Sequence, residues 1–232
     1  LIKSTKVAYP STIMLELTNQ CNLACTTCPR VYAYGKEMSK GYMDVNAAKK
    51  VIDELWPYLD SIGLTGMGET FMYKDIAEVV KYIKQKNKGI IISVSTNGVL
   101  PNFIDAVSEV VGLIDTIQVS IDGLNDVYES IRIKSNFKIL DQNLRKLVQL
   151  AQHTDTVIML NMVVVKENFR DMPKLVDYAK EIGIKYLDFS LFNVAAVTTI
   201  DISYYEFYQT REFKEELATL EDKIKATPDI TV

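Results

Sequence analysis

Cysteine is nearly absent from this chain, and where it occurs it is confined to one place. Cys21, Cys25 and Cys28 lie within eight residues of one another, and the rest of the 232 residues hold none. A chain of this length buries roughly 70 to 75% of its unfolded surface without covalent cross-links. An odd, crowded set of thiols is also a poor disulfide framework. The sequence therefore predicts that these cysteines bind a metal or carry out redox chemistry.

Long apolar runs and an excess of positive charge are also missing. No stretch approaches the ~18 apolar residues that a membrane span needs, and Tyr9-Pro10-Ser11 interrupts the start before a secretory core could form. The 26 basic and 30 acidic residues give a net charge of -4, which argues against a basic surface that binds nucleic acid. We therefore expect a cytoplasmic protein without a membrane or nucleic-acid partner.

Six short apolar segments alternate with amphipathic stretches. They indicate buried strands near residues 13–17, 61–65, 89–95, 115–121, 157–165 and 186–192. Helices are predicted at 46–59, 74–86, 137–152, 172–183 (preceded by Asp171 as its cap) and 204–226. Apolar strands that alternate with helices predict an α/β fold with a parallel sheet. Because no GxGxxG motif follows a strand, we expect a partial (βα)6 TIM-like barrel rather than a doubly wound sheet.

The chain shows no linker, low-complexity tract or shift in composition, so we expect one domain over residues 1–232. Residues 1–12 would form an N-terminal lead-in and residues 204–232 a last helix and tail. In barrels of this kind the chemistry lies on the loops that follow the C-terminal ends of the strands. The longest such loop, from Thr18 to about Met43, carries all three cysteines.

The CxxxCxxC spacing lets three sulfurs converge on one centre from a single loop. A structural zinc site needs four closed ligands, but there is no fourth cysteine, and the only histidine, His153, is expected at the opposite end of the barrel. A cubane cluster held by three cysteines would leave one iron open, which suits a catalyst. A catalytic cluster is therefore favoured over a structural metal or an electron carrier.

The stretch LTNQCNLACTTCPR resembles the cluster loop of the radical S-adenosylmethionine (SAM) enzymes, most closely the subgroup with a cysteine-rich (SPASM-type) C-terminal extension. The resemblance spans nearly the whole chain, and the extension is absent from these 232 residues, which stop at ATPDITV, about where it begins in the relatives. Two alternatives are open: the protein lacks the extension, or the sequence is truncated before it. The resemblance implies a [4Fe-4S] cluster on Cys21, Cys25 and Cys28. The open iron would bind SAM, and reductive cleavage would give a 5'-deoxyadenosyl radical that abstracts hydrogen from a substrate.

The resemblance also implies partners. The reaction would need an external electron donor such as flavodoxin or ferredoxin. A peptide or protein substrate is slightly favoured over a small molecule, although no residue of the sequence identifies it. The alternative is an iron-sulfur electron-transfer or structural metal-binding protein without SAM chemistry.

The same resemblance assigns SAM contacts after the second strand. The segment LTGMGET is similar to the family's Gly-Gly-Glu-Pro motif, in which Gly68 and Glu69 match while Met67 and Thr70 differ. Glu69 would accept hydrogen bonds from the ammonium group of SAM. In the cluster loop, Thr27 stands where the family commonly has an aromatic residue.

After the third strand, Ser95 and Asn97 are predicted to bond the ribose hydroxyls. After the fourth, Ser120 would contact the ribose or the carboxylate of SAM. Arg132 would pair with that carboxylate, because a guanidinium matches a carboxylate through two donors at once. Asp122 is expected to cap or orient this loop.

The fifth and sixth strands are assigned to the adenine. Val163 would pack on it, and Leu191 with Phe192 would close the site. Asn161, within the fifth apolar run, must find hydrogen-bond partners. Asn168 resembles a recurrent loop asparagine of the family.

Overall fold

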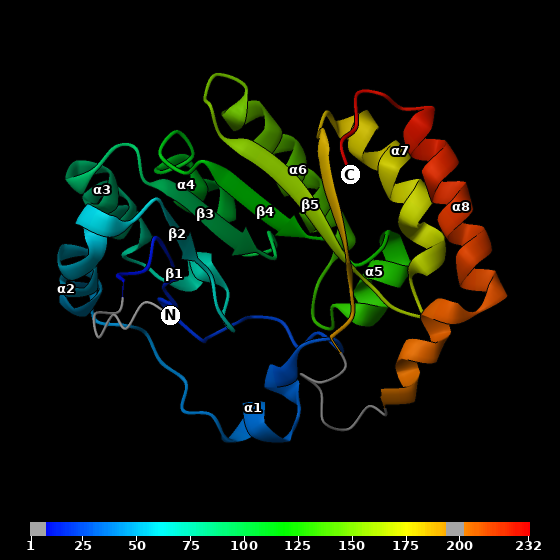
Figure 1. Cartoon of the computed structure of the whole chain (residues 1–232), viewed down its shortest axis with the longest axis horizontal. Coiled ribbons are helices and arrows are strands. Elements are labelled where there is room, and N and C mark those ends of the chain that lie inside the picture. The colour runs from blue at the N-terminus through cyan, green and yellow to red at the C-terminus, as the bar shows by residue number, and fades with distance from the viewer. Residues whose placement is uncertain (1–7, 194–201) are drawn as a thin grey trace, which may run out of the picture.

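The fold is built on one curved sheet of six parallel strands, which follow one another across the sheet in chain order (Figure 1). The computed structural model describes residues 8–193 and 202–232. The strands are β1 (Thr12–Met14), β2 (Ser61–Leu64), β3 (Ile91–Thr96), β4 (Thr116–Ser120), β5 (Val157–Val164) and β6 (Tyr186–Leu191). All five neighbouring pairs are parallel. The predicted α/β class and partial barrel are therefore confirmed.

The long helices cover the convex side of the sheet, and the cysteine loop crosses the opposite side at the lower edge of Figure 1. The helices are α1 (Ala33–Glu37), α2 (Val45–Leu55), α3 (Ile76–Lys86), α4 (Phe103–Ser108), α5 (Asn125–Ile131), α6 (Phe137–Ala151), α7 (Met172–Ile182) and α8 (Arg211–Lys225). The short helices α1, α4 and α5 were not predicted. No helix among the described residues is long and apolar enough to cross a membrane.

Successive side chains along each strand point to opposite faces of the sheet. One face packs against the helices, and the other faces the interior of the barrel. In β5, Leu160, Met162 and Val164 are buried against the helices, whereas Asn161 and Val163 between them are half-buried on the other side. Burial of the outward face against the helices supplies most of the core. The inward face is left to line the interior of the barrel.

The predicted helix at 204–226 is divided in two. A 3-10 helix spans Ile202–Gln209, and α8 starts at Arg211. Between them, Thr210 adopts an extended backbone, and its hydroxyl accepts a hydrogen bond from the backbone N–H of Phe213 at 3.3 Å. A threonine in this conformation caps a new helix rather than continuing the previous one. The prediction of one continuous helix was wrong because this cap lies inside it.

Asp171 precedes α7 as predicted, but its carboxylate makes no capping bond to that helix. It accepts instead from the backbone N–H of Leu124 at 3.0 Å and from the ammonium of Lys174 at 2.7 Å. Leu124 is the residue before α5. Asp171 therefore supports the start of a different helix, which lies 47 residues earlier in the chain.

Candidate functional site

The cysteine loop is closed at its base by hydrogen bonds. The backbone N–H of Met43 donates to the carbonyl of Leu17, and the hydroxyl of Thr18 donates to the carbonyl of Gly41, both at 2.8 Å. The N–H of Gly41 donates in turn to the side-chain oxygen of Asn19 at 2.8 Å. These bonds hold the two ends of the loop side by side where β1 leads into α2.

The middle of the loop is bonded to the end of α5. The backbone N–H of Ala24 donates to the carbonyl of Ile133 at 3.0 Å, and that of Thr26 donates to the carbonyl of Ile131 at 2.9 Å. Cys25 lies between these two anchor points. Its position is therefore set by the segment that follows β4, far from it in sequence.

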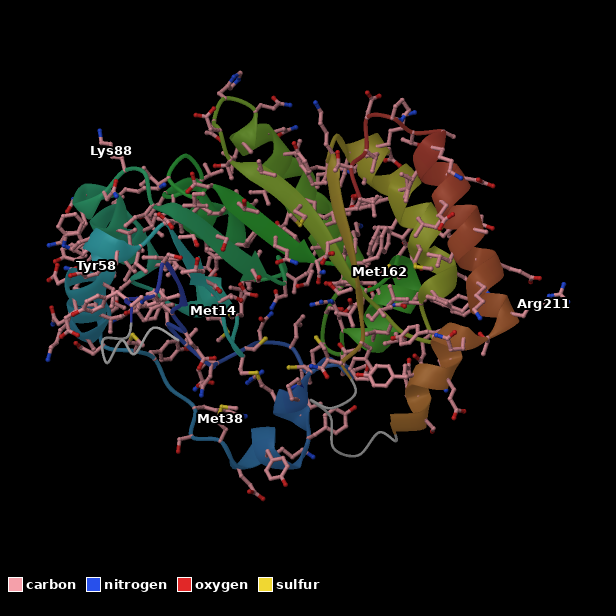
Figure 2. The ribbon with its side chains drawn as sticks, in the orientation of Figure 1. Met14, Met38, Tyr58, Lys88, Met162 and Arg211 are labelled. Atoms are coloured by element: carbon pink, nitrogen blue, oxygen red, sulfur yellow. The ribbon has the colours of Figure 1, made fainter. Side chains whose placement is uncertain are left out.

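The three cysteines line one cavity of about 220 Å³ at the C-terminal ends of β2, β3 and β4. In Figure 2, Met14 and Met38 lie on this side of the molecule, whereas Lys88 lies at the end where the strands begin. The cavity brings together several predicted site residues, namely Gly68, Glu69, Ser95, Asn97, Ser120 and Arg132. Its other lining residues, which we did not assign to the site, are Leu23, Thr65, Gly66, Met67 and Thr96, together with Thr27.

Burial changes the acidity of two of the three thiols. Burial raises the pKa of Cys21, and it raises the pKa of Cys25 to about 11. Both therefore keep their protons at neutral pH until a metal displaces them. Among the described residues no three His, Cys, Asp or Glu side chains are grouped around a single-ion site. Three thiols that border a shared cavity, each able to bind its own iron, fit a [4Fe-4S] cluster.

Glu69 joins the ends of β2 and β3. One oxygen of its buried carboxylate accepts from the hydroxyl of Thr96 at 2.7 Å and from the N–H of Phe71 at 3.1 Å, and the other accepts from the N–H of Asn97 at 2.7 Å. Burial raises the pKa of Glu69, and the hydrogen bonds from Asn97 and Thr96 oppose that rise. Its second oxygen can still accept one more donor. The predicted contact with an ammonium group stays a prediction.

Asn97 is directed at the cysteine loop rather than at open space. Its side-chain amide donates to the side-chain oxygen of Asn22 at 2.8 Å and lies 3.8 Å from the sulfur of Cys21. Its own oxygen accepts from the N–H of Val99 at 3.0 Å. The amide predicted to bind ribose is thus already engaged, because its contacts hold the loop. Ser95, whose hydroxyl makes a 3.3 Å bond to Gln118, is the better placed of the two for a ligand.

Arg132 is buried and borders the cavity, and the carboxylate of Asp122 balances its charge on the side away from the cavity. Its Nε lies 2.9 Å from Oδ2 of Asp122, a close ion pair that lacks the alignment of a hydrogen bond. Burial lowers the pKa of Arg132, but its interactions with Asp122 first, and then with Cys25 and Tyr128, together raise that pKa above its ordinary value. The other oxygen of Asp122 accepts from the N–H of Val163 at 2.9 Å. Asp122 therefore orients the guanidinium and the end of β5, and it does not line the cavity itself.

Two residues assigned to the adenine occupy different faces. Val163 lies on the inward side of β5, half-buried, and is paired in register with Ser190 of β6. Leu191 follows Ser190, so it lies on the outward alternation, and it is 60% exposed. Neither Val163 nor Leu191 is among the residues that line the cavity, and the alternation of β6 turns Leu191 away from it, which corrects its expected place. The contact of Val163 with the adenine stays a prediction. Phe192 is buried beside Val165.

Asn168 closes the turn after β5. Its side-chain oxygen accepts from the N–H of Val165 at 2.7 Å, and its amide donates to the carbonyls of Val163 at 2.8 Å and Asp122 at 3.2 Å. Only 1% of the residue is exposed. Its observed contacts join the ends of β4 and β5.

Gly68 allows the cysteine loop to approach β2. A Cβ at this position would lie 2.2 Å from the carbonyl oxygen of Thr18 and 2.7 Å from that of Gln20. Since both atoms belong to the backbone, Gly68→Ala has to displace the loop, and we expect it to lower the free energy of unfolding by about 1–3 kcal/mol and to reduce iron binding. Urea denaturation and iron assay measure these effects. Gly41→Ala is the matched control in the same loop, because a Cβ there meets nothing within 4 Å; equal behaviour of the two variants would contradict the prediction.

The site therefore has the geometry of a cofactor-binding barrel mouth, with soft ligands on one loop and polar groups on successive strand ends. The model of the Radical SAM superfamily matches residues 15–179. The chain belongs to this superfamily, whose members use a [4Fe-4S] cluster and S-adenosylmethionine.

Curated relatives match most of this chain but only part of their own length. The GTP 3',8-cyclase of Synechocystis is 33% identical over 183 residues, covering 76% of this chain and 53% of the relative. The tungsten-containing aldehyde ferredoxin oxidoreductase cofactor-modifying protein of Pyrococcus furiosus is 27% identical over 179 residues, covering 74% of this chain and 49% of that protein. The chain thus spans about half the length of these relatives.

The fold also matches solved structures. Streptococcus suis SuiB, bound to its precursor peptide SuiA, superimposes with a TM-score of 0.72 at 16% identity, covering 94% of this chain and 47% of SuiB. At this identity the likeness concerns the fold alone. It agrees with the partial barrel described above.

Proposed function

We propose that this chain is a radical SAM enzyme in which Cys21, Cys25 and Cys28 hold a [4Fe-4S] cluster beside bound SAM. The observation that carries this proposal is the single cavity that the three thiols share with Glu69 and Arg132. When bound, the cluster supplies the electron for reductive cleavage of SAM to a 5'-deoxyadenosyl radical. The electron would come from an external flavodoxin or ferredoxin.

The protein's own residues would bind and orient SAM. Arg132, fixed from behind by Asp122, presents a positive charge to the cavity and suits the carboxylate of SAM. The second carboxylate oxygen of Glu69 can accept one more hydrogen bond and suits the ammonium group of SAM. The hydroxyls of Ser95 and Ser120 lie at the ends of β3 and β4, where they suit the ribose. The cysteine loop, which lines one side of the cavity, would exclude water from the reacting atoms on that side.

The hydrogen donor is a peptide or a small molecule. SuiB was solved with a precursor peptide, whereas the relative from Synechocystis is a GTP cyclase. SuiB shares the fold alone with this chain and shows that the fold occurs in a peptide-binding protein, whereas the Synechocystis relative supports a small molecule. The inward face of the barrel is where either substrate would lie.

Anaerobic reconstitution with iron and sulfide tests the proposal. We expect about four irons per chain and, on reduction in the presence of SAM, formation of 5'-deoxyadenosine detected by mass spectrometry. A fully loaded cluster that never cleaves SAM under strong reduction would contradict the proposal. That outcome would favour the alternative of an electron carrier or structural metal protein.

A further inference from the structure

The inward face of the sheet carries almost no charge. Counting alternate residues from Ser120, the inward strand positions are Thr12, Met14, Ser61, Gly63, Ile91, Ser93, Ser95, Thr116, Gln118, Ser120, Val157, Met159, Asn161, Val163, Tyr186, Asp188 and Ser190. Asp188 of β6 is the only ionisable carboxylic acid among these described positions, and there is no lysine or arginine. Glu16 follows Met14 on the same alternation, but its carboxylate already accepts a hydrogen bond from the N–H of Met67. Asp188 is therefore the one negative charge within the six strands themselves that faces the interior of the barrel.

The carboxylate of Asp188 is held by one of its two oxygens. Oδ2 accepts hydrogen bonds from the side-chain amide of Asn161 and from the hydroxyl of Ser190, the latter at 2.7 Å. The same amide of Asn161 also lies 3.0 Å from the Ser190 oxygen, so the three side chains form a closed triangle. Within residues 8–193 and 202–232, Oδ1 has no hydrogen-bond partner and no cation pairs with Asp188. The carboxylate is thus fixed in position while one oxygen remains available.

This triangle lies beside the cavity rather than at a remote surface. Ser120, which lines the cavity, is paired in register with Asn161, and Asn161 is paired with Asp188. Two strand spacings of about 4.8 Å separate the backbones of Ser120 and Asp188. Asp188 is therefore within reach of a molecule that occupies the barrel next to the cofactors.

We propose that Asp188, held by Asn161 and Ser190, anchors a positively charged group of the substrate, an ammonium or a guanidinium. The inference rests on the proposed function, since it assigns the substrate class of that same barrel. A partly buried carboxylate with a free oxygen and no counter-charge gains a charge-assisted hydrogen bond from such a group. A neutral or anionic group in its place would leave the carboxylate without a partner.

Calorimetric binding of two probes to the reconstituted protein with SAM tests the inference. n-Butylammonium and 1-butanol have similar size, and only the first is charged at neutral pH. We expect the ammonium to bind about tenfold more tightly than the alcohol, as one charge-assisted hydrogen bond provides. Asp188→Asn should lose this preference, and Asp188→Glu should keep part of it. Asp188→Ser provides a second neutral variant should the first not fold.

Asp105→Asn on α4 is the matched control, because it removes an exposed carboxylate from the outer layer and should leave the preference unchanged. The inference is overturned if the unsubstituted protein shows no preference for the ammonium, or if the neutral variants at Asp188 retain it. A tenfold loss of SAM affinity in Asp188→Asn would also overturn it, since Asp188 would then serve the cofactor. Failure of the proposed function would be seen separately, as an unsubstituted protein that does not cleave SAM.

Discussion

Replacing Cys25 with alanine is expected to abolish both the cluster and the cleavage of SAM. The thiol of Cys25 borders the cavity, and with three cysteines in the whole chain no other one can take its place. We expect iron to fall from about four per chain to near zero, and formation of 5'-deoxyadenosine to fall at least about 100-fold. Iron and sulfide assays, with mass spectrometry of the product, measure both.

Thr26→Ala is the matched control for this variant. Thr26 is the next residue, its side chain is exposed, and its contact with Ile131 is made by the backbone, which the substitution keeps. It should keep the iron content and the rate of the unsubstituted protein. A Cys25→Ala protein that held a full complement of iron would show that Cys25 is not a ligand.

Asp122→Asn is expected to lower the free energy of unfolding more than Gly68→Ala or Asp177→Asn does. The change leaves the guanidinium of Arg132 buried without its counter-charge, since only 10% of that side chain and none of the Asp122 side chain is exposed. Breaking one partner of such a pair costs about 3–5 kcal/mol. Urea denaturation of the metal-free protein under anaerobic conditions measures the free energy of unfolding.

The exposed pair between Lys223 and Asp177 supplies a comparison. Its side chains are 34% and 61% exposed, so Asp177→Asn should cost less than about 1 kcal/mol. Adding Arg132→Met to Asp122→Asn should recover part of the lost stability, because the uncompensated charge is then removed. Equal stability of the Asp122→Asn and Asp177→Asn variants would contradict the role assigned to the buried pair.

The central strands were predictable because alternate residues are buried against helices, as in β5, so the apolar run is visible locally. Short helices escaped prediction for the opposite reason. The five residues of α1 and the seven of α5 are too few to display a helical period. The break at Thr210 was missed because aromatic residues continue on both sides of it, and the cap depends on one backbone conformation.

The position of a site residue was predictable where it follows from the end of a strand, whereas its role stays a prediction. The three cysteines, Gly68 and Ser120 meet at one cavity for that reason. The partners of Asp122 and Asn97, which are Arg132 and Asn22, could not be predicted, because the tertiary fold brings each pair together. The bond from Asn97 to Asn22 spans 75 residues. No local pattern contains that pairing.

The hydrogen bonds that close the base of the cysteine loop determine where the loop tolerates a change in length. Because Thr18 and Gly41 are already joined, the stretch between them behaves as a ring whose closure does not depend on its outer arc. Lengthening such a ring is inexpensive, since each doubling of a flexible loop costs only about 0.6 kcal/mol. The part of the ring that holds the sulfurs is fastened separately to α5. The amide of Asn19 also donates to the sulfur of Met38 at 3.2 Å and to the carbonyl of Ser39 at 2.8 Å, so these two residues belong to the closed base. Changes in length at the exposed residues Lys36 and Glu37, which lie outside that base, are therefore expected to leave the cysteines in place.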